Sequence, residues 1–597
     1  MRKRFLRSLL FVAVACLTIG LIACGEESSS GLKFELLENG TYEVSDFKGS
    51  QTEVVIPAEH KGKPVTAIGD RAFLNANEIR SLEIPDTVTS IGKKAFYYCD
   101  EMIEISIPDS VVSIGERAFE KCYALTDISL PDNLTAIEAW TFYGCEELHN
   151  LVIPESVKTI GDYAFYACRN LVRIDIPESV ESIGAFSFCA CNRAVSINIS
   201  NSVKTISRGA FSYCRGATWL AFPDSVEEIG DQAFGRCSSL TTVEIPETVK
   251  TIGAEAFAEC ESLTDISLPD GVQYVAPNAF DKCEKLNYTA SGEYRYLGNA
   301  NNPYLYLASV PKTITQANID ERCKIVGNFS KCENLTNVVI PEGVKTLTND
   351  AFSYCYSLKS VTLPNSLEMV GASAFYCCTA LTEISFPAGL KTIGNKAFDY
   401  CQSLTSVSLP NSIEQVGSGA FPSTVAKTQE NGLSFLGNES NPYLCLVGTS
   451  NVDSVRIPAE CKVVAGGALG EEIKAIQVDE GNTVFQSIDG NLYTKGGETL
   501  IRYAAGKPDT RFIVPSSVKE IVGGAFTNCD NLGRLMIGAN VERISGSAIS
   551  GVGYLTVYCK AAKKPIGWES GLFSNEELTF VWNNSSYYLP NGELVIW

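Results

Sequence analysis

Apolar side chains recur along most of this chain at a fixed interval of 23 residues. The first run of this column is Ile84, Ile107, Leu130, Ile153, Ile176, Ile199, Phe222, Ile245 and Leu268. The same interval returns in a second run, Ile340, Leu363, Phe386 and Leu409. A fixed period of roughly 20–50 residues is typical of solenoids, whose stacked coils bury together a core that none could bury alone.

Residues 125–145 show how one coil is built. Leu125, Ile128 and Leu130 have the spacing of a short strand whose apolar side chains alternate inward. Pro131 follows directly and ends the strand, because proline has no N–H group to donate to a neighbouring strand. Each coil is therefore expected to contribute one short strand to a parallel sheet.

The second half of the coil predicts a second extended segment, followed by a turn whose side chains fill the interior of the coil. Leu134 and Ile137 form the next inward pair and predict a second short extended segment. In most coils a glycine follows, such as Gly115, which suits a tight turn. The pair Ala118-Phe119 then predicts a short helical turn that fills the interior. The predicted fold class is an α/β-type repeat solenoid of about 23-residue coils, mostly parallel strands with short helical turns.

Most of the 22 cysteines close a coil, three residues after its phenylalanine. This column contains Cys99, Cys122, Cys145, Cys168, Cys191, Cys214, Cys237, Cys260, Cys283, Cys332, Cys355, Cys378, Cys401 and Cys529. Stacked once per coil, their Cβ vectors would run parallel, which favours a ladder of buried, reduced thiols over disulfides. No C-x-x-C pair is present, so we expect no metal site.

Two inserts interrupt the period and match each other. Residues 296–305 and 435–444 share the motif aromatic-Leu-Gly-Asn followed by Asn-Pro-Tyr-Leu. The match indicates either a duplicated block of coils or two equivalent β-hairpins at one edge of the solenoid. A third irregular stretch, residues 485–512, contains Asp489-Gly490 and predicts another hairpin.

The full pattern L-x-x-I-x-L-P-x-x-V-x-x-I-G-x-x-A-F-x-x-C resembles the leucine-rich repeats of BspA-like bacterial surface proteins. The resemblance covers most of the chain, and all of its columns agree. It implies a leucine-rich-repeat fold and exposure on a bacterial cell. It also implies a non-catalytic role in adhesion to extracellular-matrix proteins or to other cells.

The amino-terminal residues predict export. Arg2, Lys3, Arg4 and Arg7 precede an apolar stretch that ends in Leu21-Ile22-Ala23-Cys24, which resembles a bacterial lipoprotein signal. By that resemblance Cys24 is lipidated and anchors the protein to the cell envelope; the alternatives are a plain secretory signal and a coincidental cysteine. Glu26 and Glu27 resemble the surface-export signals of some lipoproteins, which implies the outer face.

The pattern divides the chain into successive segments. They are a signal peptide (1–23), an acidic tether (24–31), an amino-terminal cap with the first coils (32–83), a first repeat block (84–285), an insert (286–331), a second block (332–422), a second insert with irregular coils (423–512), a third block (513–550) and a carboxy-terminal cap (551–597).

Charge and composition narrow the possible partners. The net charge of −21 disfavours nucleic acid and anionic membrane surfaces, so contact with a membrane is expected only through the Cys24 anchor. His60 and His149 are the only histidines, and neither has a nucleophile at a known spacing. We therefore expect no enzymatic activity, no catalytic residues and no cofactor.

The outward positions of the predicted strands form the candidate binding face. Its candidate residues are Asp127, Ser129, Asn150, Arg173, Asp175, Asn198, Trp219, Glu244 and Asp265. Trp219, with Arg173 and Arg215 within about two coils, is expected either to fill a local packing gap or to serve as an exposed aromatic anchor. The predicted partner is a host or neighbouring-cell surface protein. A glycan ligand and a passive structural spacer are the alternative functions.

Overall fold

A computed structural model describes residues 30–561, together with 565, 567, 568, 572, 578–582, 586–588 and 594–596. The predicted signal peptide, the lipidation candidate Cys24 and all but the end of the tether lie outside the described residues. The chain divides into two compact units, Met1–Ser156 and Val157–Trp597.

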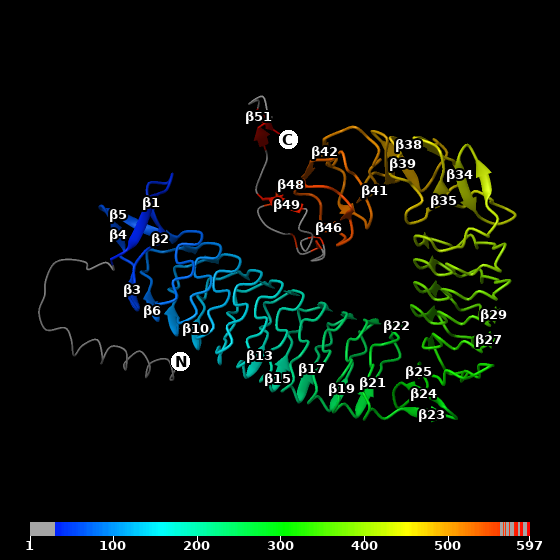
Figure 1. Ribbon diagram of the computed structural model, residues 1–597, viewed down its shortest axis with the longest axis horizontal. Coiled ribbons are helices and arrows are strands. Elements are labelled where there is room, and N and C mark those ends of the chain that lie inside the picture. The colour runs from blue at the N-terminus through cyan, green and yellow to red at the C-terminus, as the bar shows by residue number, and fades with distance from the viewer. Residues whose placement is uncertain are drawn as a thin grey trace, which may run out of the picture. The chain divides into compact units, whose positions relative to one another are not determined.

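The first unit is a stack of coils with two columns of strands (Figure 1). One column contains β1 (Leu32–Leu36), β2 (Tyr42–Phe47), β4 (Glu59–His60), β5 (Lys63–Ile68), β7 (Ser90–Ile91), β9 (Ser113–Ile114) and β11 (Ala136–Ile137). The other contains β3 (Glu53–Val55), β6 (Ser81–Glu83), β8 (Glu104–Ser106) and β10 (Asp127–Ser129). β1 and β2 pair antiparallel at the start of the stack, whereas the later coils pair parallel.

The second unit, taken by itself, contains the same two kinds of column. Up to residue 422, and apart from the hairpins of the first insert, its three-residue strands are β13 (Arg173–Asp175), β15 (Ser196–Asn198), β17 (Trp219–Ala221), β19 (Thr242–Glu244), β21 (Asp265–Ser267), β27 (Asn337–Val339) and β29 (Ser360–Thr362). The two-residue strands of the same part are β12 (Thr159–Ile160), β14 (Ser182–Ile183), β16 (Thr205–Ile206), β18 (Glu228–Ile229), β20 (Thr251–Ile252), β22 (Tyr274–Val275), β26 (Ile325–Val326), β28 (Thr346–Leu347), β30 (Met369–Val370), β31 (Thr392–Ile393) and β32 (Gln415–Val416).

The inserts form antiparallel strands, as predicted. The first contains β23 (Thr289–Ser291), β24 (Tyr294–Leu297) and β25 (Tyr306–Ser309); the second contains β33 (Thr428–Glu430), β34 (Leu433–Leu436) and β35 (Cys445–Thr449). Both sets join the two-residue column, because β25 pairs parallel with β26 and β35 with β37 (Val463–Val464). The two inserts are equivalent, since Asn299 and Asn438 each donate to a strand-column carbonyl, of Leu268 at 2.9 Å and of Leu409 at 2.8 Å.

The remaining strands complete the irregular region. They are β36 (Ser454–Ile457), β38 (Ala475–Val478), β39 (Phe485–Ile488), β40 (Asn491–Thr494), β41 (Thr499–Arg502), β42 (Arg511–Ile513), β43 (Glu520–Ile521), β44 (Phe526–Thr527), β45 (Arg534–Ile537), β46 (Arg543–Ile544), β47 (Ile549–Ser550), β48 (Leu555–Cys559), β49 (Leu578–Val581), β50 (Ser586–Tyr588) and β51 (Leu594–Ile596). β39 and β40 pair antiparallel, which confirms the third predicted hairpin.

The predicted helical turns are wrong, because residues 30–561 contain no α-helix. Lys94 and Tyr98 flank the Ala95-Phe96 pair and have left-handed φ angles of 56° and 61°, which interrupt any helix. Within the turn, backbone N–H groups alternate in direction. Phe96 donates to the next coil, to the carbonyl of Ala118 at 2.8 Å, whereas Ala95 donates back to Gly92 at 3.3 Å. Bonds between coils therefore replace the helical pattern.

The turn glycines are needed because a side chain would clash with the neighbouring coil, and not because their backbone adopts a left-handed φ angle. The φ angle of Gly92 is not left-handed. A Cβ atom there would lie 2.6 Å from the backbone nitrogen of Asp70 in the preceding coil, and one at Gly115 would lie 2.6 Å from that of Lys93. A tight turn was predicted from these glycines, but the structure shows that they let neighbouring coils approach closely.

Phenylalanine rings form the core of each stack. In the second unit, the rings of Phe165, Phe188 and Phe211 lie 5.0 and 5.6 Å apart, with planes 12° and 8° from parallel. The cysteine column lies beside them, and most of its thiols donate to a backbone carbonyl. Cys214 Sγ, for example, donates to the carbonyl of Phe188, 26 residues earlier, at 3.3 Å. The described cysteines are free thiols, in agreement with the predicted reduced ladder.

Candidate functional site

Trp219 lies on the exposed side of the strand column. β13, β15 and β17 pair parallel, so that Arg173, Ser196 and Trp219 occupy one row across three coils. Leu220 points into the core and is buried, whereas Trp219 is 54% exposed. Such exposure is high for a large apolar side chain and excludes the alternative in which Trp219 fills a packing gap.

Two valines extend the exposed surface beside Trp219. Val172 and Val195 precede β13 and β15 and are 37% and 46% exposed. Their backbones are held in register, since Val195 N–H donates to the carbonyl of Val172 at 2.9 Å and Thr218 N–H to that of Val195 at 3.2 Å. We name Val172, Arg173, Val195, Ser196 and Trp219 the Trp219 surface. Its exposed valines were not predicted.

Two residues further along the same strands, the polar candidates Asp175 and Asn198 hydrogen-bond to each other. Asp175, Asn198 and Ala221 are in register, and Asn198 Nδ2 donates to Asp175 Oδ1. An aspartate and an asparagine that satisfy each other stabilise the sheet and are less available to a ligand. Arg215, predicted to flank Trp219, places its guanidinium over the ring of Tyr213, 5.7 Å from the centroid.

Two further candidates of the second unit, Glu244 and Asp265, lie on β19 and β21. Glu244 pairs in register with Ser267. Asp265 accepts hydrogen bonds from Thr264 Oγ1 at 2.7 Å and from Asn287 Nδ2 at 3.1 Å. These hydrogen bonds lower the pKa of Asp265. It is therefore an ionised, solvated carboxylate rather than a proton donor.

The remaining candidates belong to the first unit. Asp127 and Ser129 are exposed on β10, and Asn150 forms an isolated parallel bridge with Asp127. The Asn150 Nδ2 atom lies 3.5 Å from Asp127 Oδ1. They repeat in the first unit the Asp–Asn pairing of the second.

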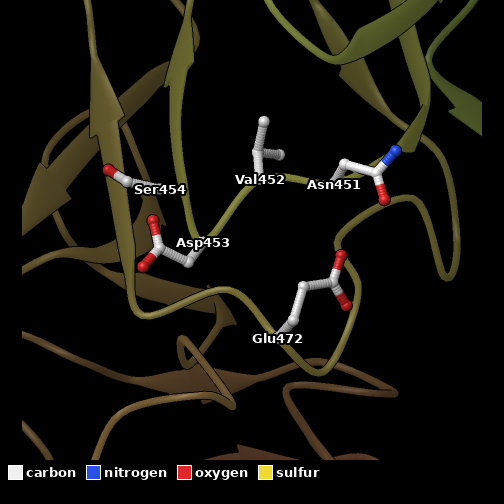
Figure 2. Close-up of a pocket in the computed structure, with 5 residues that line it drawn as sticks. All are labelled: Asn451, Val452, Asp453, Ser454 and Glu472. Atoms are coloured by element: carbon white, nitrogen blue, oxygen red, sulfur yellow. The ribbon is translucent and has the colours of Figure 1, made fainter.

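The described residues include an open hollow but no cluster of metal ligands. Among the described residues, no group of three or more histidine, cysteine, aspartate or glutamate side chains is arranged to hold a metal ion. An open hollow of about 480 Å³ is lined by Asn451, Val452, Asp453, Ser454 and Glu472 (Figure 2). Its carboxylates are engaged, since Asp453 pairs with Lys474 at 3.1 Å and Glu472 accepts from Thr449 at 3.4 Å.

Burial keeps most of the described cysteine thiols protonated. Burial raises the pKa of Cys355 to about 12, and it also raises the pKa of Cys191. A thiol that stays protonated at neutral pH is a poor nucleophile. Cys377 differs because it is half-buried.

The described residues also contain no helix that could span a bilayer.

Comparison with protein families gives a direct assignment. The model of the BspA-type leucine-rich-repeat region matches residues 66–194, 158–287, 325–432 and 507–582, which is more than half of the chain. The chain belongs to the BspA-type leucine-rich-repeat family.

Solved structures include similar proteins from several bacteria. A leucine-rich-repeat protein of Bacteroides ovatus is 22% identical, with 76% of this chain and 100% of that chain covered and a TM-score of 0.33. A leucine-rich cell surface protein of Faecalibacterium prausnitzii is 24% identical over 76% and 97%, with a TM-score of 0.27. A T. pallidum leucine-rich-repeat protein is 28% identical over 36% and 91%, with a TM-score of 0.29. A search of curated proteins finds no match to this BspA-type protein.

Proposed function

We propose that this BspA-type protein is a non-catalytic adhesin that binds another protein through the Trp219 surface. The observation that carries the proposal is the exposure of Trp219 beside Val172 and Val195. Tryptophan is among the side chains that contribute most to protein–protein interfaces, because it buries a large area with few rotatable bonds.

The proposed place of action is the outer surface of a bacterial cell. Membership of the BspA-type family supports it, together with the signal-like residues before Cys24. The proposed partner is a surface protein of a host or of a neighbouring cell. Cys24 would tether the repeats to the envelope through its lipid.

A passive spacer is the second candidate function. Polar side chains on the strand face satisfy one another, as in the Asp175–Asn198 pair and in the bond from Ser360 Oγ to Asn337 Oδ1 at 2.7 Å. A face of this kind stabilises the stack without any ligand. The spacer function predicts that no partner depends on Trp219.

Binding to arrayed matrix proteins and glycans would test the proposal. For any partner found, Trp219→Ala is expected to weaken binding by at least about 2 kcal/mol, or about 30-fold in Kd. Val339→Ala is the matched control, because Val339 is 64% exposed on β27 of the same unit. An equal loss in both variants, or no loss in Trp219→Ala, would contradict the proposal. Glycan hits alone would favour sugar binding.

A further inference from the structure

Three exposed arginines lie in the same three successive coils as Trp219 and its strand neighbours. Arg173 shares its row on β13, and Arg193 and Arg215 lie in the loops that lead into β15 and β17. All three are exposed. Arginine and tryptophan together are the side chains most enriched where interfaces are strong.

Other basic residues of the stack are neutralised by a carboxylate in a neighbouring coil. Glu259 lies between Arg236 at 3.0 Å and Lys282 at 2.9 Å, and Glu368 lies between Lys345 at 3.4 Å and Lys391 at 2.8 Å. Within the described chain, Arg173, Arg193 and Arg215 have no carboxylate within ion-pair distance. Their charge is therefore not cancelled by the fold.

The contacts that these arginines do make leave their charge intact. Arg193 Nη1 donates to the amide oxygen of Asn170 at 3.2 Å, and Arg215 lies over the ring of Tyr213. The nearest acid in the same strand, Asp175, is bonded by Asn198. Between Arg173 and Trp219, Ser196 Oγ is enclosed and has no hydrogen-bond partner within the described chain.

Unpaired arginines on a protein of net charge −21 are complementary to a negative ligand. Repulsion from the rest of the surface is screened beyond about 10 Å at 0.1 M salt, so that direct contacts decide binding. A purely ionic glycan would offer no apolar group to contact the valines and the indole of Trp219. They match a peptide in which acidic side chains alternate with apolar ones.

We infer that the Trp219 surface binds an acidic segment of the partner protein, with Arg173, Arg193 and Arg215 pairing its carboxylates and Trp219 covering an apolar side chain. Arginine holds a carboxylate through two parallel N–H bonds, which fixes orientation as well as charge. This inference rests on the proposed function and names the chemistry of the partner.

The test uses a fluorescent peptide of alternating Glu and Leu and a second peptide with Gln in place of Glu. Fluorescence anisotropy at constant ionic strength is expected to show binding at least about tenfold tighter for the acidic peptide. Arg193→Gln with Arg215→Gln should remove most of that difference, as should Trp219→Ala. Arg456→Gln is the control, because Arg456 is also exposed but is paired with Asp479 at 2.9 Å.

Two results would overturn the inference. One is equal binding of the two peptides. The other is binding of a sulfated glycan such as heparin, through the same arginines, with no dependence on Trp219. A matrix partner that depends on Trp219 but not on Arg193 and Arg215 would refute the acidic segment and leave the adhesin intact. Absence of any Trp219-dependent partner would instead refute the proposed function itself.

Discussion

Two runs of coils in the second unit, residues 165–221 and 329–409, have the same interior and different exteriors. Inside, Phe165 and Phe188 stack at 5.0 Å in the first run, and Phe352 and Phe375 at 5.2 Å in the second. In both runs a cysteine thiol donates to the phenylalanine carbonyl 26 residues earlier, as in Cys378 to Phe352 at 3.1 Å.

The exteriors differ in what their charges do. The second run pairs Lys345 and Lys391 with Glu368, and Ser360 with Asn337. The first run leaves Arg173 and Arg193 without a carboxylate partner in the described chain and exposes Trp219. Because the same core supports both exteriors, the core does not depend on the side chains of the Trp219 surface, which carry the proposed binding.

Alkaline pH is expected to destabilise both interiors strongly. Native thiols stay protonated above pH 9, since burial raises the pKa of Cys355 to about 12, whereas unfolded thiols ionise near 9.0. The unfolded chain then binds fewer protons, so the free energy of unfolding falls as pH rises from about 9 to about 12, by up to about 1.4 kcal/mol per thiol and pH unit.

Chemical denaturation at pH 8 and pH 10 would measure this loss. The substitutions Cys191→Ala and Cys355→Ala, one in each run, should reduce the pH dependence of the free energy of unfolding by similar amounts. A loss confined to one run, or a pH dependence unchanged by either substitution, would show that the interiors are not equivalent.

Removing one ring from each core should have the next largest effect. Phe188→Ala and Phe375→Ala each delete a fully buried side chain, so we expect losses of about 3–5 kcal/mol that agree within about 1 kcal/mol. Local hydrogen exchange of the neighbouring coils would measure both. Trp219→Ala is the surface control and should change stability by less than about 0.5 kcal/mol. A much smaller loss at one phenylalanine would break the comparison.

Adding a methyl group at the turn glycines should cost less. A Cβ atom at Gly184 would lie 2.5 Å from the Asp162 nitrogen, and one at Gly371 would lie 2.6 Å from the Asn349 nitrogen. Substitution of either by Ala is expected to destabilise its coils by about 1–3 kcal/mol. Gly389→Ala is the matched control, because its nearest atom, Asn365 O, is 3.7 Å away. If thermal unfolding shows that Gly389→Ala destabilises the protein as much as the other two substitutions, close approach of neighbouring coils is not the cause of their destabilisation.

The period of the sequence was sufficient to predict the stack, because coils that bury the same column must face the same way. It predicted the inward residues, the free thiols and the hairpins of the inserts. It did not predict the turn, since the left-handed φ of residues such as Lys94 and Tyr98 is imposed by hydrogen bonds to the next coil. Residues 381–387 form no strand although their pattern matches the others.

The candidate site was predicted less completely. Trp219 and Arg173 could be placed outward by the alternation of the strand. Val172 and Val195 could not, because they precede the strands, where no periodic rule fixes exposure. That Asp175 is occupied by Asn198 depends on register between coils, which a single coil does not reveal.

The hydrogen bonds from each turn to the next also govern how such a gene can change in length. A recombination that adds or removes one whole coil leaves every donor with an acceptor of the same kind, whereas a break within a coil leaves several without one. Viable length variants of this protein should therefore differ by whole coils. The inserts keep the pairing although they depart from the 23-residue period, because β25 and β35 pair with β26 and β37.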